Sequence, residues 1–538
     1  MTQSLLPAAT LPAAALALAS LLLPVATATA QEGVRGVCGT EDVDIAITKA
    51  NIAAARAYAK THPDAAERDE ITYIPVRFKI VGDADGTGEA SVGNILNLIE
   101  AINRDFAPYN WRFFLRDEDG TPFDYFFNDD YNGGLSDDGN FVERERSRDA
   151  VTMFVVQDAS TGGTSIGVTL GYYSPRQDIL VLRTAEVSNN AETATHELGH
   201  YFSLPHTFRG WDFETWDGAV CSDTAFNSPV TELRAPNSLG GVRPLVELVT
   251  RGDGANCDEA GDLFCDTQAD YNLGFSYRGC NYRGPVVDRN GDPLRPNEDN
   301  FMSYFQDCPS YEFSVEQFDA VEADYRSSRR NFLRGGEGPI RTDTVSARAV
   351  ITSPADGTTT DFSDVVTLSW DPVENATYYY VELNRNRSLS DNSSIFQGVV
   401  TADQTSIELD GLDPGRIYYA RVRGFNQLTV GLPSAQMRFR TGTVSSTTVP
   451  QAVAGLTLSP NPATGAEGAI ATFTTEAGGD FELELLDAVG RRITRERVTL
   501  APGSVRRRLT TDAPLAAGTY FFHVRGEGGV TTRRLLVR

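Results

Sequence analysis

Lysine is nearly absent from this chain of 538 residues, which contains only Lys49, Lys60 and Lys79. Arginine therefore carries almost all of the positive charge, and acidic residues outnumber basic ones by 73 to 47. The resulting net charge of −26 opposes binding to phosphate backbones and to anionic lipid. Nucleic acid and anionic membranes are thus excluded as partners, whereas so acidic a surface is typical of a solvated, secreted protein.

Long apolar runs are missing after the N-terminus, so no transmembrane segment is expected in the mature protein. The N-terminal stretch LPAAALALASLLLPVATATAQ has an apolar core and ends in small residues near Ala30. This pattern is typical of a secretory signal peptide, which we place at residues 1–30. Pro24 and the small-residue tail favour cleavage over a retained membrane anchor. The protein is therefore expected to be exported.

The chain divides by composition. Residues 31–71 are polar and rich in alanine, with one short helical pattern, and indicate a pro-segment ending in an exposed linker. From residue 72 alternating β-branched runs predict strands, followed by a helix that begins near Asn189 with Glu192 placed as in a capping box. Residues 72–333 are thus predicted to form an α+β domain.

The remainder is expected to be all-β. Beyond a linker at 334–347, a strand ends in Trp370 just before Pro372, and a second, tyrosine-rich strand follows a Leu-x-Pro-Gly turn that begins at Leu412. These landmarks closely resemble a fibronectin type III sandwich, placed at residues 348–442.

The last segment, residues 453–538, contains four motifs in this order: Pro-Asn-Pro, Asp-x-x-Gly-Arg, Ala-Gly-Thr-Tyr and a basic, aliphatic ending. It resembles the C-terminal sorting domain of the type IX secretion system of Bacteroidetes, with a generic β-sandwich as the alternative. The resemblance implies the type IX machinery as a partner. It also implies export through the periplasm of a Gram-negative, Bacteroidetes-like bacterium to the cell surface or medium.

Three of the five histidines fall in ETATHELGHYFSLPHTF, residues 192–208. His196 and His200 are four positions apart, so a helix turns both rings to one face, where they can share a metal ion. His206 follows six residues later, the spacing at which metzincins supply a third ligand. Glu197 lies beside the metal position without needing to coordinate, which suits a general base. The simpler alternative is a surface helix with two solvated histidines.

At this point a family resemblance becomes definite. HELGHYFSLPHTF, GDLFCDTQA (261–269), NFMSY (300–304) and a cysteine at 308 followed by FSVEQ resemble the pappalysin family of metzincin metalloendopeptidases, over about residues 72–333. The family usually has glycine where this chain has Ser203. Glycine is preferred because the residue that ends the helix adopts positive φ, which costs a non-glycine residue about 1 kcal/mol.

The resemblance implies a metzincin-like α+β fold and zinc held by the three histidines. Glu197 would be the catalytic base, and Tyr304 would stabilise the oxyanion, although Tyr304 suits core packing nearly as well. Met302 would be the structural floor beneath the histidines. The strand at 167–175 would be the edge that pairs with substrate backbone.

Acidic residues and cysteines suggest further features. The loop 256–270 presents Asp258, Glu259, Asp262, Asp266 and Thr267, and the resemblance implies that Asp262, Asp266 and Thr267 bind calcium. A solvated acidic loop is the alternative.

Six cysteines are present, and an exported protein can oxidise them. Cys257 and Cys265 are close enough in sequence to pair, and the resemblance implies a second disulfide between Cys280 and Cys308. Cys38 and Cys221 remain. They either pair with each other, or Cys38 acts as a cysteine switch whose thiolate occupies the fourth position of zinc.

The pattern as a whole predicts a secreted zinc-dependent metalloendopeptidase. It would hydrolyse peptide bonds of extracellular proteins through a zinc-activated water, and would be made as a latent zymogen. The alternative is a cell-surface adhesive protein with a non-catalytic metal site. The tripeptide Arg-Gly-Asp at 251–253 favours this alternative. A structural zinc site is closed and has no use for a glutamate beside it, so Glu197 favours the enzyme.

Overall fold

The structure is a computed structural model that describes residues 36–537 with gaps. No helix among the described residues is both long and apolar enough to cross a bilayer. The predicted signal peptide (1–30) and Cys221 lie outside the described residues. The gaps are 41–42, 63–69, 85–86, 118–120, 136–138, 161–167, 212–245, 276, 278, 285, 289, 364, 390–393, 444–452, 460, 462, 464–468, 476, 489, 510, 512 and 527–528.

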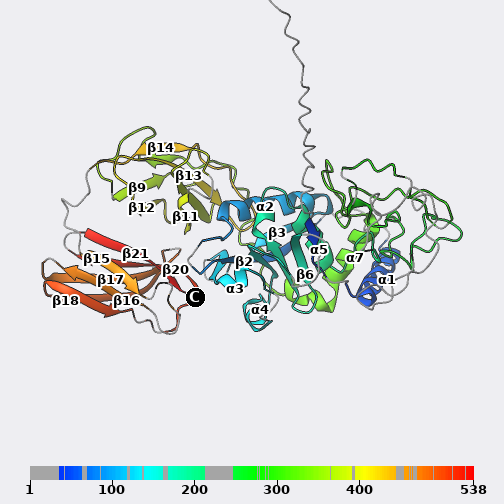
Figure 1. The fold of residues 1–538 in the computed structure, drawn as a ribbon, viewed down its shortest axis with the longest axis horizontal. Helices are drawn as coiled ribbons and strands as arrows, with labels where there is room; N and C mark the ends of the chain where they lie inside the picture. Colours follow the sequence, from blue (N-terminus) through cyan, green and yellow to red (C-terminus); the bar gives the residue numbers. More distant parts are fainter. Residues whose placement is uncertain are drawn as a thin grey trace, which may run out of the picture. The chain divides into compact units, whose positions relative to one another are not determined.

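A mixed sheet of seven strands forms the centre of the first domain (Figure 1). The strand order is β1-β6-β7-β5-β2-β3, and β4 extends the pairing of β2 beyond the end of β3. All pairs are parallel except β6 with β7. The strands are β1 (Gly36–Cys38), β2 (Thr72–Gly82), β3 (Trp111–Leu115), β4 (Phe123–Phe127), β5 (Val151–Val156), β6 (Val168–Ser174) and β7 (Ile179–Arg183).

The central strand β2 is buried along nearly its whole length, as expected of a parallel strand covered on both faces. Helix α2 packs near β3, and α5 packs against β6 and β7. The α-helices are α1 (Ile45–Thr61), α2 (Val92–Asp105), α3 (Asp129–Asn132), α4 (Gly139–Glu145), α5 (Glu192–Tyr201), α7 (Val315–Arg326) and α8 (Asn331–Arg334). Short 3-10 turns are η1 (Ala107–Tyr109), η2 (Thr184–Glu186), η3 (Leu273–Phe275) and η4 (Ser328–Arg330).

The start of α5 corrects the sequence prediction. The helix begins at Glu192 and has no side-chain cap at Ala191, so the capping box expected from Asn189 is wrong. The Asn190 carboxamide instead accepts from the Glu192 backbone N–H at 3.1 Å, while the Asn190 N–H donates to the Ser188 hydroxyl. Two local side-chain turns therefore compete successfully with an earlier helix start.

Residues within the predicted pro-segment form β1 and α1. The Asp44 carboxylate caps α1 by accepting from the Ala46 N–H at 2.9 Å. Helix α1 packs along α7, and β1 joins the sheet at its β6 edge. This segment is therefore an integral part of the fold around α5.

Two sheets make up the all-β region after residue 350. One has the order β11-β10-β13-β14 and the other β12-β9-β8, and Trp370 is buried between them. Tyr418 is buried as well, and its hydroxyl accepts from the Asp413 N–H at 2.8 Å, which fixes the turn before its strand. The strands are β8 (Ile351–Ser353), β9 (Val365–Trp370), β10 (Tyr378–Asn384), β11 (Ser394–Thr401), β12 (Ser406–Asp410), β13 (Ile417–Phe425) and β14 (Met437–Arg440).

The last segment is another two-sheet sandwich, with orders β15-β16-β19 and β18-β17-β20-β21. Its apolar residues alternate inward into one buried cluster. The strands are β15 (Ala454–Ser459), β16 (Ile470–Thr475), β17 (Gly479–Asp487), β18 (Arg492–Leu500), β19 (Gly503–Arg508), β20 (Gly518–Gly526) and β21 (Gly529–Val537). The predicted order, a domain of helices and strands followed by all-β sandwiches, is confirmed.

Candidate metal centre

Helix α5 and the turn after it bring three imidazoles together. His196 and His200 lie on one face of the helix, and His206 reaches them from the chain beyond it; all three are buried. Their Nε2 atoms form a triangle. The distance is 3.2 Å from His196 to His206 and 3.1 Å for each of the other two pairs. The sequence spacing therefore predicted this convergence correctly.

Hydrogen bonds on the far side of two rings fix their tautomers. Nδ1 of His196 lies 2.6 Å from the Phe301 carbonyl, and Nδ1 of His200 lies 2.8 Å from the Leu204 carbonyl. A carbonyl only accepts, so each Nδ1 carries the proton and each Nε2 turns a lone pair toward the others. Lone pairs this close repel one another unless a cation lies between them.

The donor set fits zinc. Nitrogens bound at about 2.0–2.1 Å to a tetrahedral ion are separated by about 3.4 Å, close to the triangle seen here. Burial, reinforced by the neighbouring His206, lowers the pKa of His196 to about 3. Burial likewise holds the pKa of His200 well below its usual range. Both rings are therefore neutral at physiological pH, as metal ligands must be.

Ser203 makes the turn that delivers the third histidine. Its φ is +71°, the left-handed conformation predicted for this position. The Ser203 hydroxyl accepts from the Arg329 guanidinium at 2.5 Å, and its carbonyl accepts from the Thr48 hydroxyl of α1 at 2.8 Å. A glycine here would relieve the backbone strain but lose the bond to Arg329. The serine is therefore anchored as well as strained.

Residues 300–304 form the floor of the site. Met302 is fully buried, and a Cβ added to Gly199 would lie 2.3 Å from its sulfur, so α5 rests directly on this side chain. The Met302 carbonyl accepts from the Thr207 N–H at 3.1 Å, which ties the floor to the segment carrying His206. Met302 thus lies where the resemblance placed it.

Tyr304 stands beside the triangle. Its ring centroid is 5.2 Å from that of His206 and 6.0 Å from that of His196. Its hydroxyl accepts from the Cys38 N–H at 3.1 Å. A phenol at this place can donate to an oxygen bound near the metal position, once the main chain of Cys38 has left.

Cys38 completes the cluster from the pro-segment. Among the described residues, Cys38 and the three histidines are the one group of His, Cys, Asp or Glu whose ligand atoms all approach one another closely, within 4.8 Å. Burial, followed by the charge of Glu197, raises the pKa of the Cys38 thiol well above its usual range. A divalent cation acts in the opposite sense, because a coordinating thiol is deprotonated. Cys38 is unpaired here, and Cys221 lies outside the described residues.

The strand that carries Cys38 adds to the edge of the sheet. Strand β1 pairs in parallel with β6, and the Gly39 N–H continues the pairing by donating to the Gly171 carbonyl at 2.8 Å. The predicted substrate strand at 167–175 is thus an edge that already accepts an added strand of this chain.

Glu197 is fully buried beside the metal position. Its Oε2 accepts from the Thr40 hydroxyl at 2.7 Å, whereas its Oε1 has no hydrogen-bond partner within the described structure. Burial raises the pKa of Glu197 to about 7. A carboxyl with such a pKa is suited to take up and release a proton near neutral pH.

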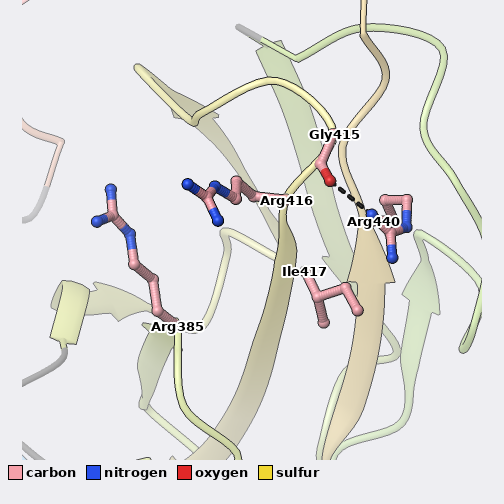
Figure 2. Close-up of a pocket in the computed structure, with 5 residues that line it drawn as sticks. All are labelled: Arg385, Gly415, Arg416, Ile417 and Arg440. Atoms are coloured by element: carbon pink, nitrogen blue, oxygen red, sulfur yellow. Dashed lines mark hydrogen bonds between the residues drawn. The ribbon is translucent and has the colours of Figure 1, made fainter.

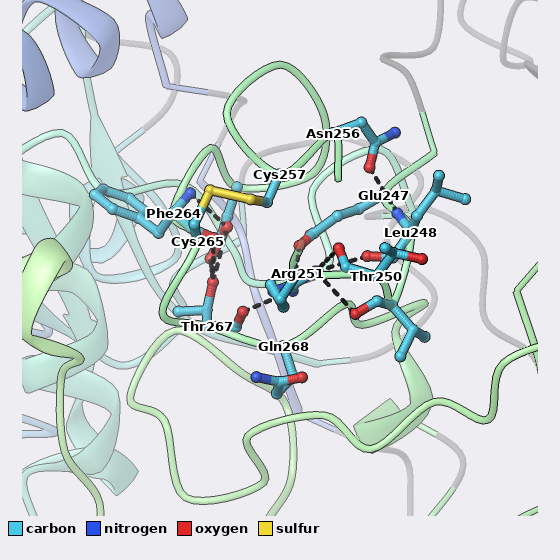
Figure 3. A network of polar contacts seen from close by, with 12 residues as sticks. Glu247, Leu248, Thr250, Arg251, Asn256, Cys257, Phe264, Cys265, Thr267 and Gln268 are labelled. Carbon is cyan, nitrogen blue, oxygen red and sulfur yellow. Dashed lines mark hydrogen bonds and ion pairs between the residues drawn. A yellow bond between two sulfur atoms is a disulfide. The ribbon is translucent and has the colours of Figure 1, made fainter. Parts of the chain in front are cut away.

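A second group of acidic residues lies in the loop region after α5. Glu247 and Asp262 are buried, and a Cβ on Gly261 would lie 2.1 Å from Oε2 of Glu247, an oxygen for which the described residues offer no hydrogen-bond partner. Figure 3 shows Arg251 pairing with the other Glu247 oxygen at 2.6 Å and with the Thr267 carbonyl at 2.7 Å. The guanidinium thus pairs directly with one of the two buried carboxyls, Glu247.

The three residues predicted to bind calcium do not all lie together in the structure. Asp262 accepts from the Thr267 hydroxyl at 2.9 and 3.0 Å, so these two stay together. Asp266 turns away: its oxygens accept from the Ser314 hydroxyl and from the Glu316 N–H at the start of α7. We therefore assign Asp266 to the helix terminus and not to the cation ligands, because a carboxylate is stabilised there by the helix dipole.

Buried carboxyls in this region hold protons tightly. Burial raises the pKa of Asp262 to about 7 and that of Asp270 to about 6. Burial and the charge of Asp262 raise the pKa of Glu247 well above its usual range. The sequence reasoning missed Glu247, which stands alone in a stretch without a recognisable spacing, and Thr40, for which only its place after the Cys-Gly pair was a signal.

Both predicted disulfides are present. Cys257 pairs with Cys265 beside the Glu247 network, and Cys280 pairs with Cys308, which ties the loop region to the segment after Met302. Disulfide bonding is therefore confirmed, and it is consistent with an oxidising compartment.

A hollow of about 450 Å³ lies in the all-β region after residue 350 (Figure 2). Arg385, Arg416 and Arg440 line it with Gly415 and Ile417. The arginines are exposed, and two already have partners: Arg440 donates to the Gly415 carbonyl at 2.6 Å, and Arg385 pairs with Asp413 at 2.7 Å. Exposed pairs of this kind do not by themselves define a binding site.

Comparison with known proteins identifies one domain. The fibronectin type III family model matches residues 357–440, within the predicted 348–442. No curated protein matches the chain. A two-domain fibronectin type III segment of chicken tenascin is 18% identical, with 36% of this chain and 99% of that chain covered and a TM-score of 0.13. The fn3 domain of human contactin 1 is 19% identical, with 21% and 96% covered and a TM-score of 0.15.

The fn3 domain of the human collagen alpha-1(XX) chain is 22% identical, with 20% and 96% covered and a TM-score of 0.15. TM-scores of this size carry no argument about the rest of the chain. The family model and the two-sheet arrangement around Trp370 and Tyr418 agree with each other. Residues 357–440 are therefore a fibronectin type III domain.

Proposed function

We propose that this protein is a zinc-dependent metalloendopeptidase of the pappalysin type, made as a latent zymogen and active on extracellular proteins. The observation that carries the proposal is the meeting of four elements at one point. Three Nε2 atoms converge, a buried glutamate lies beside them, the Tyr304 ring packs against two of the imidazoles, and the Cys38 thiol lies close to all three.

The chain's own residues divide the work. Zinc, when bound by the three histidines, supplies Lewis-acid polarisation of a carbonyl and of water. Glu197 accepts the proton of the attacking water and returns it to the leaving amine, for which its pKa of about 7 is suitable. The Tyr304 hydroxyl donates to the developing oxyanion. The edge of β6 would bind the peptide backbone and hold it across the site once β1 has left.

A structural zinc site is the nearest rival, because one cysteine and three histidines can close a tetrahedron. Two features favour catalysis. A purely structural site has no use for a fully buried glutamate whose second oxygen lacks a partner. The thiol also comes from a segment that precedes the histidines by more than 150 positions and is followed by a predicted cleavable linker, so the fourth ligand is removable.

The adhesive alternative receives no support from residues 251–253. The Arg251 side chain is turned inward, where it holds Glu247 and the carbonyls of Leu248 and Thr267. A receptor that recognises Arg-Gly-Asp needs an accessible guanidinium, and this one is already occupied.

The test is hydrolysis of a denatured protein by the processed chain, with zinc measured on the same sample. A Glu197→Ala variant is the matched control, because it should bind zinc and cleave nothing. Zinc-free, active protein or an active Glu197→Ala variant would refute the proposal.

We also propose calcium at Glu247, Asp262 and Thr267. The folded pKa values of Asp262 and Asp270, about 7 and about 6, lie above the ordinary value near 3.8. Their protonation therefore stabilises the fold at low pH, and this contribution is lost as pH rises through 6 to 7. Calcium binds the ionised form, so its stabilising effect should be larger at pH 8 than at pH 5.

Saturating calcium, at about 100 times its Kd, contributes roughly 2.7 kcal/mol. At pH 8 this should raise the melting temperature of the zinc-loaded protein by about 5–10 °C, and at pH 5 by less than half as much. Differential scanning calorimetry with calcium against magnesium measures it. Asp262→Asn should lose the calcium response and Asp266→Asn should keep it; the reverse pattern would contradict the assignment.

We propose that residues 453–538 direct secretion through the type IX machinery, a role supported by their motif order and by their independent sandwich core. Deleting this segment from the gene is expected to leave the protease inside the cell envelope. Immunoblots of medium and periplasm measure this, with deletion of the fibronectin domain as a size control. Unchanged export of the truncated chain would rule the role out.

A further inference from the structure

Residues 36–40 occupy every group on which the proposed function depends. The Cys38 sulfur lies within 4.8 Å of ligand nitrogens of the three histidines, and the Cys38 backbone N–H donates to Tyr304, while β1 covers the edge of β6. Glu197 is covered too, but by a different residue, Thr40. Cys38 therefore covers the metal site, and a separate side chain, Thr40, covers the general base.

The Thr40 hydroxyl is fixed from both sides. It accepts from the Tyr173 N–H at 2.8 Å and donates to Oε2 of Glu197 at 2.7 Å. Because the Tyr173 N–H is a donor, the hydroxyl oxygen accepts there and its proton points to the carboxyl group of Glu197. Tyr173 belongs to β6, so the same hydroxyl also joins the segment to the sheet edge.

We propose that Thr40 is a second lock of the latent state, which holds Glu197 while Cys38 holds the metal. This inference rests on the proposed function of a latent peptidase. In the locked state the Thr40 hydroxyl engages Oε2 of Glu197 and, with it, keeps the carboxyl turned toward residues 36–40. Chemical capture of Cys38 alone leaves this second attachment in place.

A purely structural role for Thr40 makes a different prediction. Its N–H donates to the Cys38 sulfur at 3.3 Å, which shapes the turn between the two residues. Any residue other than proline keeps this bond. Thr40→Val therefore preserves the turn and the branched shape and removes only the hydroxyl, whereas Thr40→Ser keeps the hydroxyl and removes only the methyl group.

The experiment measures how often the segment opens, without using peptidase activity. The full-length, zinc-loaded protein is treated with a chromogenic aromatic disulfide, and the rate of Cys38 modification is followed. Cys38→Ser serves as the blank for any other thiol. Since a buried hydrogen bond is lost, Thr40→Val should raise the rate severalfold, up to about tenfold, and Thr40→Ser should resemble the parent.

A double-mutant cycle shows whether the partner is Glu197. Glu197→Ala should raise the rate as Thr40→Val does, and the double variant should show little further increase. Equal rates for Thr40→Val and the parent, equal rates for Thr40→Val and Thr40→Ser, or fully additive effects would each overturn the proposal. Glu197→Ala and Thr40→Ser keep it testable even where Thr40→Val does not fold.

Hydrolysis by the full-length chain separates this proposal from the proposed function. Cys38→Ala should gain only part of the activity of the processed chain, and Cys38→Ala combined with Thr40→Val should gain severalfold more. A processed chain that cleaves nothing refutes the peptidase but leaves the thiol measurement intact. A full gain in Cys38→Ala alone refutes the second lock and leaves the peptidase standing.

Discussion

Replacing Glu197 by glutamine is expected to lower peptide hydrolysis by the processed chain by a factor on the order of 10²–10⁴. Glutamine keeps the shape of the side chain but cannot accept a proton from water. Since Glu197 does not belong to the triangle of nitrogens, zinc content should stay at the parent value. The variant therefore separates proton transfer from metal binding.

The measurement is kcat/KM on a quenched fluorescent peptide, with zinc determined by atomic absorption on the same preparation. Asp105→Asn is the matched control, because Asp105 is a partly buried carboxyl that accepts from α5, through the Thr195 hydroxyl at 2.8 Å. It should change the rate by less than about tenfold, since it stabilises the helix and does not touch the reacting atoms. Equal losses in both variants would show that Glu197 acts only through stability.

Replacing Arg330 by alanine should destabilise the N-terminal α/β region by about 3–5 kcal/mol, the range for breaking a buried ion pair. Arg330 is fully buried and binds Asp324 at 3.1 Å and Asp178 at 2.6 Å. It also donates to the Tyr201 carbonyl at the end of α5 and stacks on the Tyr201 ring at 3.7 Å. Its loss removes one of the two guanidinium partners of the buried Asp324, which keeps Arg329 at 2.7 Å, and the closest charged partner of Asp178.

Release of bound metal during a urea titration measures this effect, because it reports the region around the three histidines separately from the two sandwiches. Arg326→Ala is the control: its pair with Glu322 is partly exposed, so it should cost less than about 1 kcal/mol. Arg330→Lys should fall between the two, since lysine cannot bind both carboxylates and the carbonyl in one plane. Similar midpoints for the two alanine variants would contradict the role given to Arg330.

The parts of the site that the sequence predicts are those set by short-range geometry. The four-residue spacing of His196 and His200 determines which way their rings point, and the need for a turn before His206 predicts the positive φ of Ser203. The pairing of Cys257 with Cys265 follows from their closeness in the chain. In each case the geometry is determined by residues that are close to one another in the sequence.

The parts that were not predicted depend on distant packing. Thr40 meets a glutamate 157 positions away, and no local pattern marks either residue as the other's partner. Asp266 was interpreted as a calcium ligand because its residue type suits both a cation and a helix terminus, and only the approach of α7 decides between them. Glu247 becomes recognisable only when Gly261 packs against its carboxylate.

The contact of α1 with the turn at Ser203 has a consequence for how the enzyme would be switched on. Thr48 binds the Ser203 carbonyl, and Asn51 binds Asp324 at 3.1 Å, so the segment is held at a second place away from the metal. Cutting the chain after α1 breaks neither attachment. Because the strand and the helix stay joined to each other, each keeps the effective concentration of the other high. Activation would then require the cut segment to dissociate from the rest of the protein, so it would depend on dilution. At the high protein concentration of the cell envelope the cut segment would stay bound, and after release into the medium it would dissociate.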